Sequence, residues 1–242
     1  MRSRKFANER VGIGNISLKI QIKRTNRKRT ISLQVRDNKL IIKAPRTVSR
    51  KNLDEVIQRK QKWIKQKAIL NFEEQNLRNR KFIDNETFYF RGNEYRLSLI
   101  LGSKEEVKIV DGSLQVTCKD DRSVHNKNVK TLIEDFYVNE AAKMLNTRTN
   151  EFAKKIKVQP TGITVKNYVS KWGSCTSKNK ISYNWRIIMA PDCILDYLII
   201  HELCHIIEHN HSKNFWNYVG TYCEDFQKKR KWLRENGHML VL

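Results

Sequence analysis

Apolar and polar residues alternate strictly near the start of the chain, as they do in a strand with one buried face. Residues 16–23 read Ile-Ser-Leu-Lys-Ile-Gln-Ile-Lys, and residues 31–35 repeat the pattern. An Asp-Asn pair at 37–38 is typical of a turn into the next apolar run, 40–43, which Pro45 ends. The first 45 residues are therefore expected to form a small antiparallel meander whose solvent face carries lysines.

The spacing of apolar residues changes to the helical period in three longer segments. The first begins at Ser49, a good N-cap, and runs to about residue 78. The second covers about residues 126–156. The third begins at Pro191, whose missing N–H costs nothing at the start of a helix. Two short helices are expected to close the chain, at about residues 213–223 and 224–234.

Strand-like patterns return between these helices. Hairpins are expected at residues 88–99, around Gly92-Asn93, and at residues 107–118, around Asp111-Gly112. Residues 163–169 and 180–189 form two further strand-like runs. The sequence contains no internal repeat that we detect. Together these elements predict an α+β protein.

Composition limits the class of protein. With 242 residues, of which 39% are hydrophobic, the chain can bury a sizeable core. Its apolar runs are far shorter than the roughly 20 residues of a membrane-spanning helix. The basic N-terminus lacks the apolar stretch of a secretory signal. Five scattered cysteines without a Cys-x-x-Cys pair favour reduced thiols, so we expect a cytoplasmic protein without a membrane segment.

Positive charge is concentrated in the first third of the chain. The whole sequence holds 48 Lys and Arg against 25 Asp and Glu, a net charge of +23. Residues 1–80 contribute 23 basic and 6 acidic residues, or +17. Such a surplus suits a nucleic acid or an acidic partner, and a solvated lysine-rich face explains it equally well. The sequence therefore predicts weak, strongly salt-dependent nucleic-acid binding at most.

The segment His201-Glu202-Leu203-Cys204-His205 carries the most specific chemistry in the sequence. Histidines at positions i and i+4 of a helix lie one turn apart on one face, so both imidazoles can reach one zinc ion. Glu202 is rotated about 100° from His201 and can hold a water molecule without binding the metal. Metallopeptidases use this arrangement, with the metal acidifying the water and the glutamate taking its proton.

A third ligand is needed to complete a catalytic zinc site, which keeps a fourth position open. His211 lies six residues after His205, so the helix must end between them. Asn210 tolerates the left-handed conformation that ends helices, and a turn there could bring His211 back. His209 is the alternative, but three successive turns of one helix span about 12 Å, too far for one ion. We therefore favour His211.

Several motifs taken together resemble one family. They are Lys171-Trp172-Gly173-Ser174-Cys175, Ile181-Ser182-Tyr183-Asn184-Trp185-Arg186, Leu195-Asp196-Tyr197, the His201–His205 segment, Asn210-His211-Ser212 and Phe215-Trp216. The chain is similar over nearly its whole length to the YgjP-like branch of the SprT-like zinc metallopeptidases. It departs from that family at Cys223-Glu224-Asp225-Phe226, where a proline-containing segment is usual.

The resemblance implies a domain organisation and a site. Residues 1–124 would form a basic, antiparallel, β-rich region with a long helix, and residues 125–242 a zincin-like metallopeptidase domain. His201, His205 and His211 would bind one Zn²⁺ per chain, and Glu202 would be the catalytic general base.

Neighbouring residues have less specific interpretations. Gly173 could let a backbone approach closely and shape the cleft, although for the side chains we favour a tight turn whose Trp172 and Cys175 fill the core. Residues 180–189 could present a sheet edge to an extended peptide. Cys204 is expected to fill the core, and Phe215 and Trp216 to pack a short helix onto the active-site helix.

For two supporting roles the sequence offers two candidate residues each. Asp196 or Glu208 could accept the second N–H of a ligand histidine, as metal-bound imidazoles usually require. Tyr183 or Tyr218 could stabilise an oxyanion.

The sequence therefore favours a zinc-dependent peptidase, expected to be an endopeptidase, acting on protein or peptide substrates. The alternative is a DNA- or RNA-associated protein, including a DNA-linked protease, that uses the basic N-terminal region and has a structural metal site. Glu202 separates the two hypotheses, because a structural site has no use for that carboxylate.

Overall fold

The computed structural model describes residues 10–13, 16–27, 29–119 and 126–242. The chain divides into two compact units, residues 1–79 and residues 80–242, and each has its own hydrophobic core. The domain boundary expected between residues 124 and 125 lies outside the described residues and stays a prediction. The mixture of helices and sheets confirms the α+β class.

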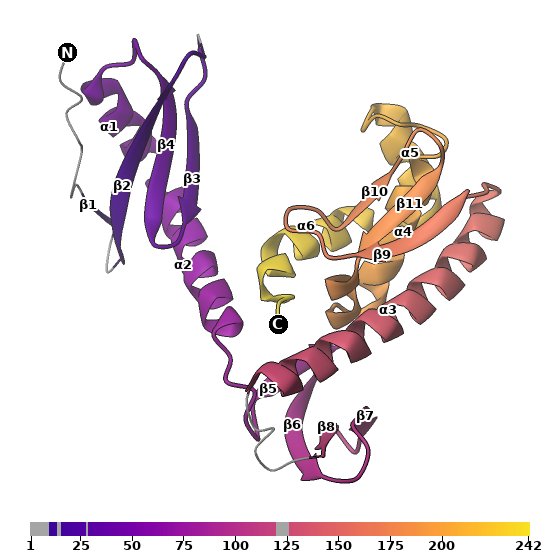
Figure 1. Ribbon diagram of the computed structural model, residues 1–242. Helices are drawn as coiled ribbons and strands as arrows, with labels where there is room; N and C mark the ends of the chain where they lie inside the picture. The colour runs from indigo at the N-terminus through magenta and orange to yellow at the C-terminus, as the bar shows by residue number, and fades with distance from the viewer. Residues whose placement is uncertain (1–9, 14–15, 28, 120–125) are drawn as a thin grey trace. The chain divides into compact units, whose positions relative to one another are not determined.

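The first unit is a four-stranded sheet followed by two helices (Figure 1). Its elements are β1 (Arg10–Ile13), β2 (Ile16–Thr25), β3 (Ser32–Arg36), β4 (Lys39–Pro45), α1 (Arg50–Arg59) and α2 (Gln61–Arg78). The helices cover one face of the sheet. The core between them consists of Leu18, Ile20, Leu40, Ile42, Ala44, Leu53, Ile57, Ile64 and Ala68.

The expectation of an antiparallel meander is wrong for one pair of strands. The strand order is β1-β2-β4-β3, and β2 and β4 run parallel. The β3–β4 hairpin does form at Asp37 and Asn38, whose φ angles of 49° and 56° match the turn type that suits a hairpin. The connection from β2 to β3 passes the position of β4, so the hairpin inserts β4 against β2. Alternation along each strand cannot reveal that choice of partner.

The helix predicted from Ser49 to residue 78 is interrupted at Lys60. Ser49 is the N-cap, as expected, and its hydroxyl accepts a hydrogen bond from the Asn52 N–H at 3.2 Å. The Lys60 N–H is shared between the carbonyls of Val56 and Ile57, each at 3.1 Å. Such sharing is common at helix ends. Each segment buries two apolar residues in the first core: Leu53 and Ile57 on α1, Ile64 and Ala68 on α2.

The second unit begins with another four-stranded sheet and a long helix. These elements are β5 (Thr87–Phe90), β6 (Asn93–Leu101), β7 (Glu106–Val110), β8 (Ser113–Cys118) and α3 (Asn126–Ile156). Both expected hairpins form. The second turns at Asp111-Gly112, as predicted, whereas the first turns at Arg91-Gly92, one residue earlier than the predicted Gly92-Asn93. The strand order is β5-β6-β8-β7, with β6 and β8 parallel.

The rest of the second unit builds a smaller sheet and a helical layer. Its elements are β9 (Gly162–Lys166), β10 (Gly173–Cys175), β11 (Lys180–Asn184), η2 (Trp185–Met189), α4 (Asp192–Cys204), α5 (Lys213–Tyr222), α6 (Phe226–Asn236) and η3 (Gly237–Met239). The strand expected over residues 180–189 ends at Asn184. There the Asn184 side chain accepts a hydrogen bond from the Arg186 N–H and begins a 3₁₀ turn.

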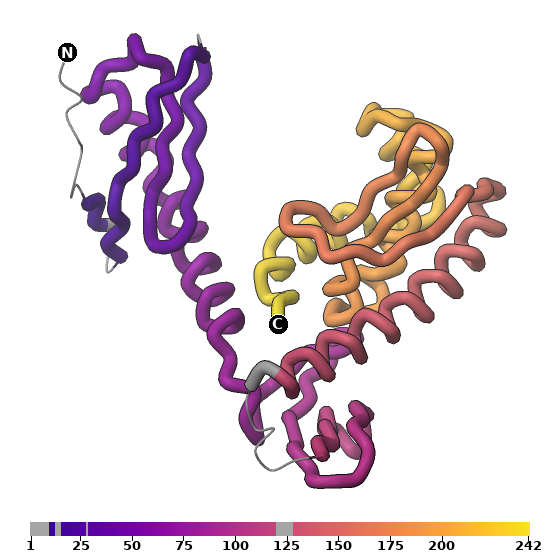
Figure 2. Tube along the Cα trace, viewed as in Figure 1, coloured from indigo at the N-terminus to yellow at the C-terminus, as the bar shows by residue number. Residues whose placement is uncertain are grey.

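The long helix α3 connects the parts of this unit (Figure 2). It packs against β7 and β8 and also against β9, η2 and α4. Tyr137, fully buried on α3, donates a hydrogen bond to the Tyr89 carbonyl at 2.8 Å and stacks on Trp185. The sheet of β5–β8 and the helix α4 therefore share one core.

None of the helices in the described ranges combines the length and the hydropathy needed to cross a lipid bilayer.

The two four-stranded sheets have the same topology, although the sequence shows no repeat. In each, the order is first-second-fourth-third, the second and fourth strands are parallel, and the third and fourth form a hairpin. The first two strands also form an antiparallel hairpin in each. The same backbone arrangement is therefore built twice from different side chains.

Candidate metal centre

Helix α4 positions the first two histidines. It begins after Pro191, as predicted, and ends at Cys204 with His205 as C-cap. His205 keeps helical dihedral angles, φ −67° and ψ −16°, so it stays one turn beyond His201 on the same face. The two imidazole ring centroids lie 4.9 Å apart.

A turn after α4 brings His211 to the same point. The helix ends earlier than expected, and Asn210 is not left-handed, so that part of the prediction is wrong. The chain instead turns back just before α5. The Ser212 hydroxyl is the N-cap of this helix and accepts a hydrogen bond from the Phe215 N–H at 3.2 Å. His211 Nε2 lies 3.1 Å from His201 Nε2.

The three histidines form a donor set that fits one metal ion. One nitrogen from each of His201, His205 and His211 lies within 4.8 Å of the others. Zinc takes histidine nitrogens at about 2 Å, so nitrogens around one ion must come this close together. His209, the alternative third ligand, is exposed and is not part of the group.

Burial keeps these imidazoles neutral, the form that binds metal. It lowers the pKa of His201 to about 3, with further lowering from His205, His211 and the positive charge of Arg230. The pKa values of His205 and His211 are also lowered, mainly by burial.

Each candidate ligand histidine has a second ring nitrogen, and the surroundings of these nitrogens differ from the prediction. His205 Nδ1 lies 3.1 Å from the backbone carbonyl of Glu208, so that residue contributes its main chain and not its carboxylate. Asp196 is paired instead with Arg148 at 2.6 Å. His201 Nδ1 is buried, and no residue in the described part of the chain forms a hydrogen bond with it.

Glu202 is buried beside the histidines, with 4% of its surface exposed. Burial raises its pKa to about 8, and the positive charge of Lys171 acts in the opposite direction. Its Oε2 atom has no hydrogen-bond partner among the described residues. An orphaned buried carboxylate is costly in a purely structural role, and such groups are typical of functional sites.

Gly173 explains how this carboxylate fits. A Cβ atom on Gly173 would lie 2.7 Å from Glu202 Cδ, closer than real Cβ contacts allow. The close backbone approach anticipated from the sequence therefore occurs here, on the short strand β10. The neighbouring Cys175 thiol is half-buried, and burial followed by the Glu202 charge raises its pKa to about 11.

Aromatic rings from α5 form one wall of the centre. Phe215 is fully buried and stacks on His205, with ring centroids 4.4 Å apart, so it packs α5 against α4 as expected. Trp216 stacks on His211 at 5.5 Å. Cys204 is fully buried, which agrees with a filling role.

Arg230 is a site residue that sequence reasoning missed. Its guanidinium carbon lies 4.5 Å from the Trp216 ring centroid, and Phe226, one turn earlier on α6, stacks on the same ring. The charge of Arg230 helps lower the pKa values of His201 and His211. The four-residue spacing of Phe226 and Arg230 was the available signal, but only the fold brings α6 to this wall.

Two further expectations are corrected. Tyr183 is fully buried and hydrogen-bonded to Thr149 at 3.1 Å, so it cannot reach an oxyanion, while Tyr218 is exposed on α5. Strand β11 is the central strand of its sheet, so its edges are not free to bind a peptide. The strand β10 is an edge strand, and it packs against α4.

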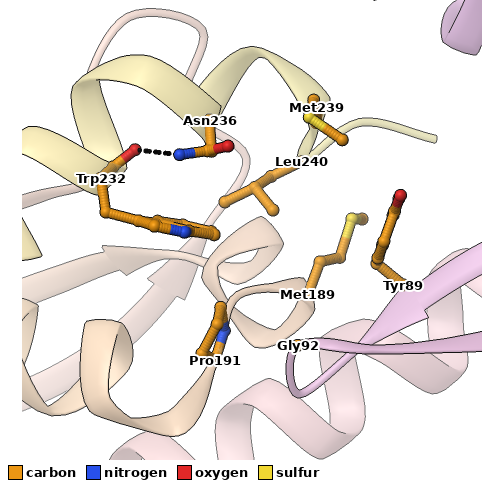
Figure 3. A pocket seen from close by; sticks show the side chains of 8 residues that line it. All are labelled: Tyr89, Gly92, Met189, Pro191, Trp232, Asn236, Met239 and Leu240. Atoms are coloured by element: carbon orange, nitrogen blue, oxygen red, sulfur yellow. Dashed lines mark hydrogen bonds between the residues drawn. The ribbon is translucent and has the colours of Figure 1, made fainter.

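A small cavity of about 80 Å³ lies elsewhere in this unit (Figure 3). Its lining is mainly apolar and includes Met189, Pro191, Trp232 and Leu240. Asn236, also at its wall, donates its side-chain amide to the Trp232 carbonyl at 2.9 Å. No histidine of the metal centre lines it, so the cavity is separate from that chemistry.

Three histidine nitrogens beside a buried carboxylate match the arrangement that metal-dependent hydrolases use. One family model, described as YgjP-like, metallopeptidase domain, matches residues 29–236. The chain therefore belongs to the YgjP-like metallopeptidase family. No curated protein and no solved structure matches it.

Proposed function

We propose that this metallopeptidase is a zinc-dependent peptidase whose ion is held by His201, His205 and His211. The observation that carries the proposal is the convergence of these three nitrogens next to the buried Glu202. Zinc suits an all-imidazole donor set, and three protein ligands leave a position for chemistry. When bound, the ion supplies Lewis acidity, which polarises a peptide carbonyl and makes water acidic.

Glu202 acts as the general base in this mechanism. It accepts a proton from the attacking water and delivers it to the leaving amine of the cleaved peptide bond. Burial raises the pKa of Glu202 above that of an exposed carboxyl group, which favours a group that accepts a proton and returns it. Gly173 supports this role because it leaves room for the carboxylate against β10.

The edge strand β10 is the proposed binding site for an extended peptide. An incoming strand can hydrogen-bond to a free sheet edge, which holds the peptide backbone without specifying its side chains. Because β10 also contacts Glu202 through Gly173, a peptide on this edge would lie beside the general base. This mode suits internal peptide bonds and hence an endopeptidase.

Arg230 is the proposed partner for a negatively charged substrate oxygen. It is exposed, it is held by Trp216, and no carboxylate among the described residues forms an ion pair with it. Its charge acts on His201 and His211, whereas the cation that acts on Glu202 is Lys171. Arg230 lies over the ring of Trp216, which stacks on His211, so Arg230 is on the histidine side of the centre.

The direct test is metal content together with cleavage of a mixed synthetic peptide library by the untagged, zinc-loaded protein. Wild type should hold about one zinc per chain and cleave library members. Glu202→Gln should keep the zinc and lose activity by about a hundredfold or more. His211→Ala should lose or loosen the zinc, and His209→Ala is the matched control that should do neither.

The alternative, a nucleic-acid-associated protein with a structural metal site, makes the opposite prediction. In that case wild type would hold zinc tightly and cleave no peptide, and Glu202→Gln would change nothing. The unpartnered Oε2 atom of Glu202 favours the peptidase. The proposed location is the cytoplasm, whose reducing conditions suit the free cysteines of the chain.

A further inference from the structure

The outer face of the first sheet, opposite its hydrophobic core, carries a set of exposed cations. We call it the cationic face; it consists of Arg10, Lys19, Lys23, Arg36, Lys39 and Lys43. All six side chains are exposed. Lys19 and Lys39 alternate with buried residues such as Ile20 and Leu40, which places them on the side away from α1 and α2.

Strand register arranges these cations in rows. Arg10 pairs with Lys19, Lys19 with Lys39, and Lys39 with Arg36, so one row of four cations crosses all four strands. Lys23 and Lys43 pair with each other four residues further along. Neighbouring strands are about 4.8 Å apart and four residues span about 13 Å, so the face is a dense positive patch.

Few negative charges compensate this patch. Strands β1, β2, β3 and β4 contain no Asp or Glu. Among the described residues, one carboxylate lies at the rim, that of Asp37, 3.5 Å from Arg36. Like charges directly opposite each other on adjacent strands destabilise a sheet. The arrangement therefore opposes folding slightly unless an anion binds there.

The second sheet is an internal reference for what this topology requires. It has the same pairing, and the positions equivalent to the row of four are Thr87, Arg96, Ser113 and Val110. The positions equivalent to Lys23 and Lys43 are Ile100 and Thr117. One cation thus stands where the first sheet has six. The topology itself therefore does not require positive charge on the outer face.

We propose that the cationic face binds the phosphate backbone of a nucleic acid. A duplex carries one negative charge per about 1.7 Å of its axis, a density that matches rows of closely spaced cations. The strands of this face contain no aromatic residue that could stack on the bases of a single strand, so the expected contacts are those of Lys and Arg with phosphates, which carry no sequence information. The face also has no exposed large apolar side chain that could anchor it in a lipid surface.

The test compares two variants of the full-length protein that lose the same net charge. The face variant Arg10→Thr, Lys39→Ser, Lys43→Thr installs the residues found at equivalent positions of the second sheet. The control variant Lys51→Gln, Lys62→Gln, Lys65→Gln removes three exposed lysines from α1 and α2. Fluorescence anisotropy measures binding to a labelled 20-base-pair duplex DNA between about 50 and 200 mM salt.

Six phosphate contacts predict a slope of about −5 for log affinity against log salt concentration. The face variant should lose about half of that slope, whereas the control should keep it to within about one. Circular dichroism should show that both variants stay folded, because the installed residues already occupy the same topology.

Three results would overturn the proposal. One is wild-type protein whose DNA affinity does not depend on salt. Another is an equal loss of slope in the two variants, which would mean that only net charge matters. The third is binding to vesicles containing phosphatidylserine without binding to DNA, which would assign the face to a membrane.

Discussion

The sheets β1–β4 and β5–β8 have the same topology but carry different residues on their outer faces. In each sheet, the second and fourth residues of the strand that follows the second hairpin turn are fully buried. They are Leu40 and Ile42 in β4, and Leu114 and Val116 in β8. Outside, the first sheet presents lysines and arginines, while the second exposes Val110 and Ile100. The fold requires the inner face to be apolar and leaves the outer face free to vary.

The two sheets also differ in what lies behind them. The core of the first unit lies between its sheet and the helices α1 and α2. The core of the second continues through α3 into α4, the helix that carries the histidines. The same strand arrangement therefore carries the exposed cations in one unit and packs against the helix of the histidine cluster in the other.

The largest expected effects come from truncating the two equivalent core leucines. Leu40→Ala and Leu114→Ala should each lower the free energy of unfolding of their own unit by about 2–5 kcal/mol. Only Leu114→Ala should weaken zinc retention, because its core reaches α4. Hydrogen exchange read by mass spectrometry should locate the loss in residues 1–79 or 80–242 respectively. Equal loosening of both units by either variant would contradict this division.

A smaller effect is expected from a glycine substitution on the edge strand β10, compared with a control on the edge strand β1. Gly173→Ala should displace Glu202 and reduce peptide cleavage by about a hundredfold, with zinc content unchanged. Gly12→Ala on β1 is the control, because a Cβ there meets nothing within 4 Å. Cleavage rates and zinc analysis of the two variants provide the comparison. Full activity in Gly173→Ala would mean that the contact does not position Glu202.

The smallest effect concerns the turn that joins the second sheet to α4. Arg91 binds Asp192 through two hydrogen bonds, at 3.0 and 2.5 Å. This bond lowers the pKa of Asp192, against a smaller opposing effect of burial. Both groups are partly exposed, so Arg91→Ala should cost about 1 kcal/mol or less near neutral pH.

The pH dependence of that loss has a defined sign. A carboxylate whose pKa is lower in the folded state stabilises the protein above its unfolded pKa, about 3.9, and stops doing so as the pH falls through the folded pKa. The difference between wild type and Arg91→Ala in urea unfolding should therefore be full at pH 7 and shrink below about pH 4. Arg96→Ala, an exposed cation on β6, should show no such difference.

Local features of the fold were predictable because they depend on residues close together in the chain. The turns at Asp37-Asn38 and Asp111-Gly112, the N-cap at Ser49 and the helix 126–156 all follow from residues within a few positions. The same holds for the one-turn spacing of His201 and His205. The strand predicted over residues 180–189 failed for a local reason. The Asn184 side chain accepts a hydrogen bond from the Arg186 N–H, which ends the strand and begins a 3₁₀ turn.

Sequence alone thus determined the position of most helices and hairpins, the charge asymmetry and the histidine pair. Tertiary structure decided that β4 inserts beside β2, that His211 returns to His201, that Gly173 meets Glu202, and that Arg230 reaches the same wall. These contacts join segments that are distant in the chain, and periodicity records only which side of an element is buried, not what buries it. The partner is chosen by the packing of the whole unit.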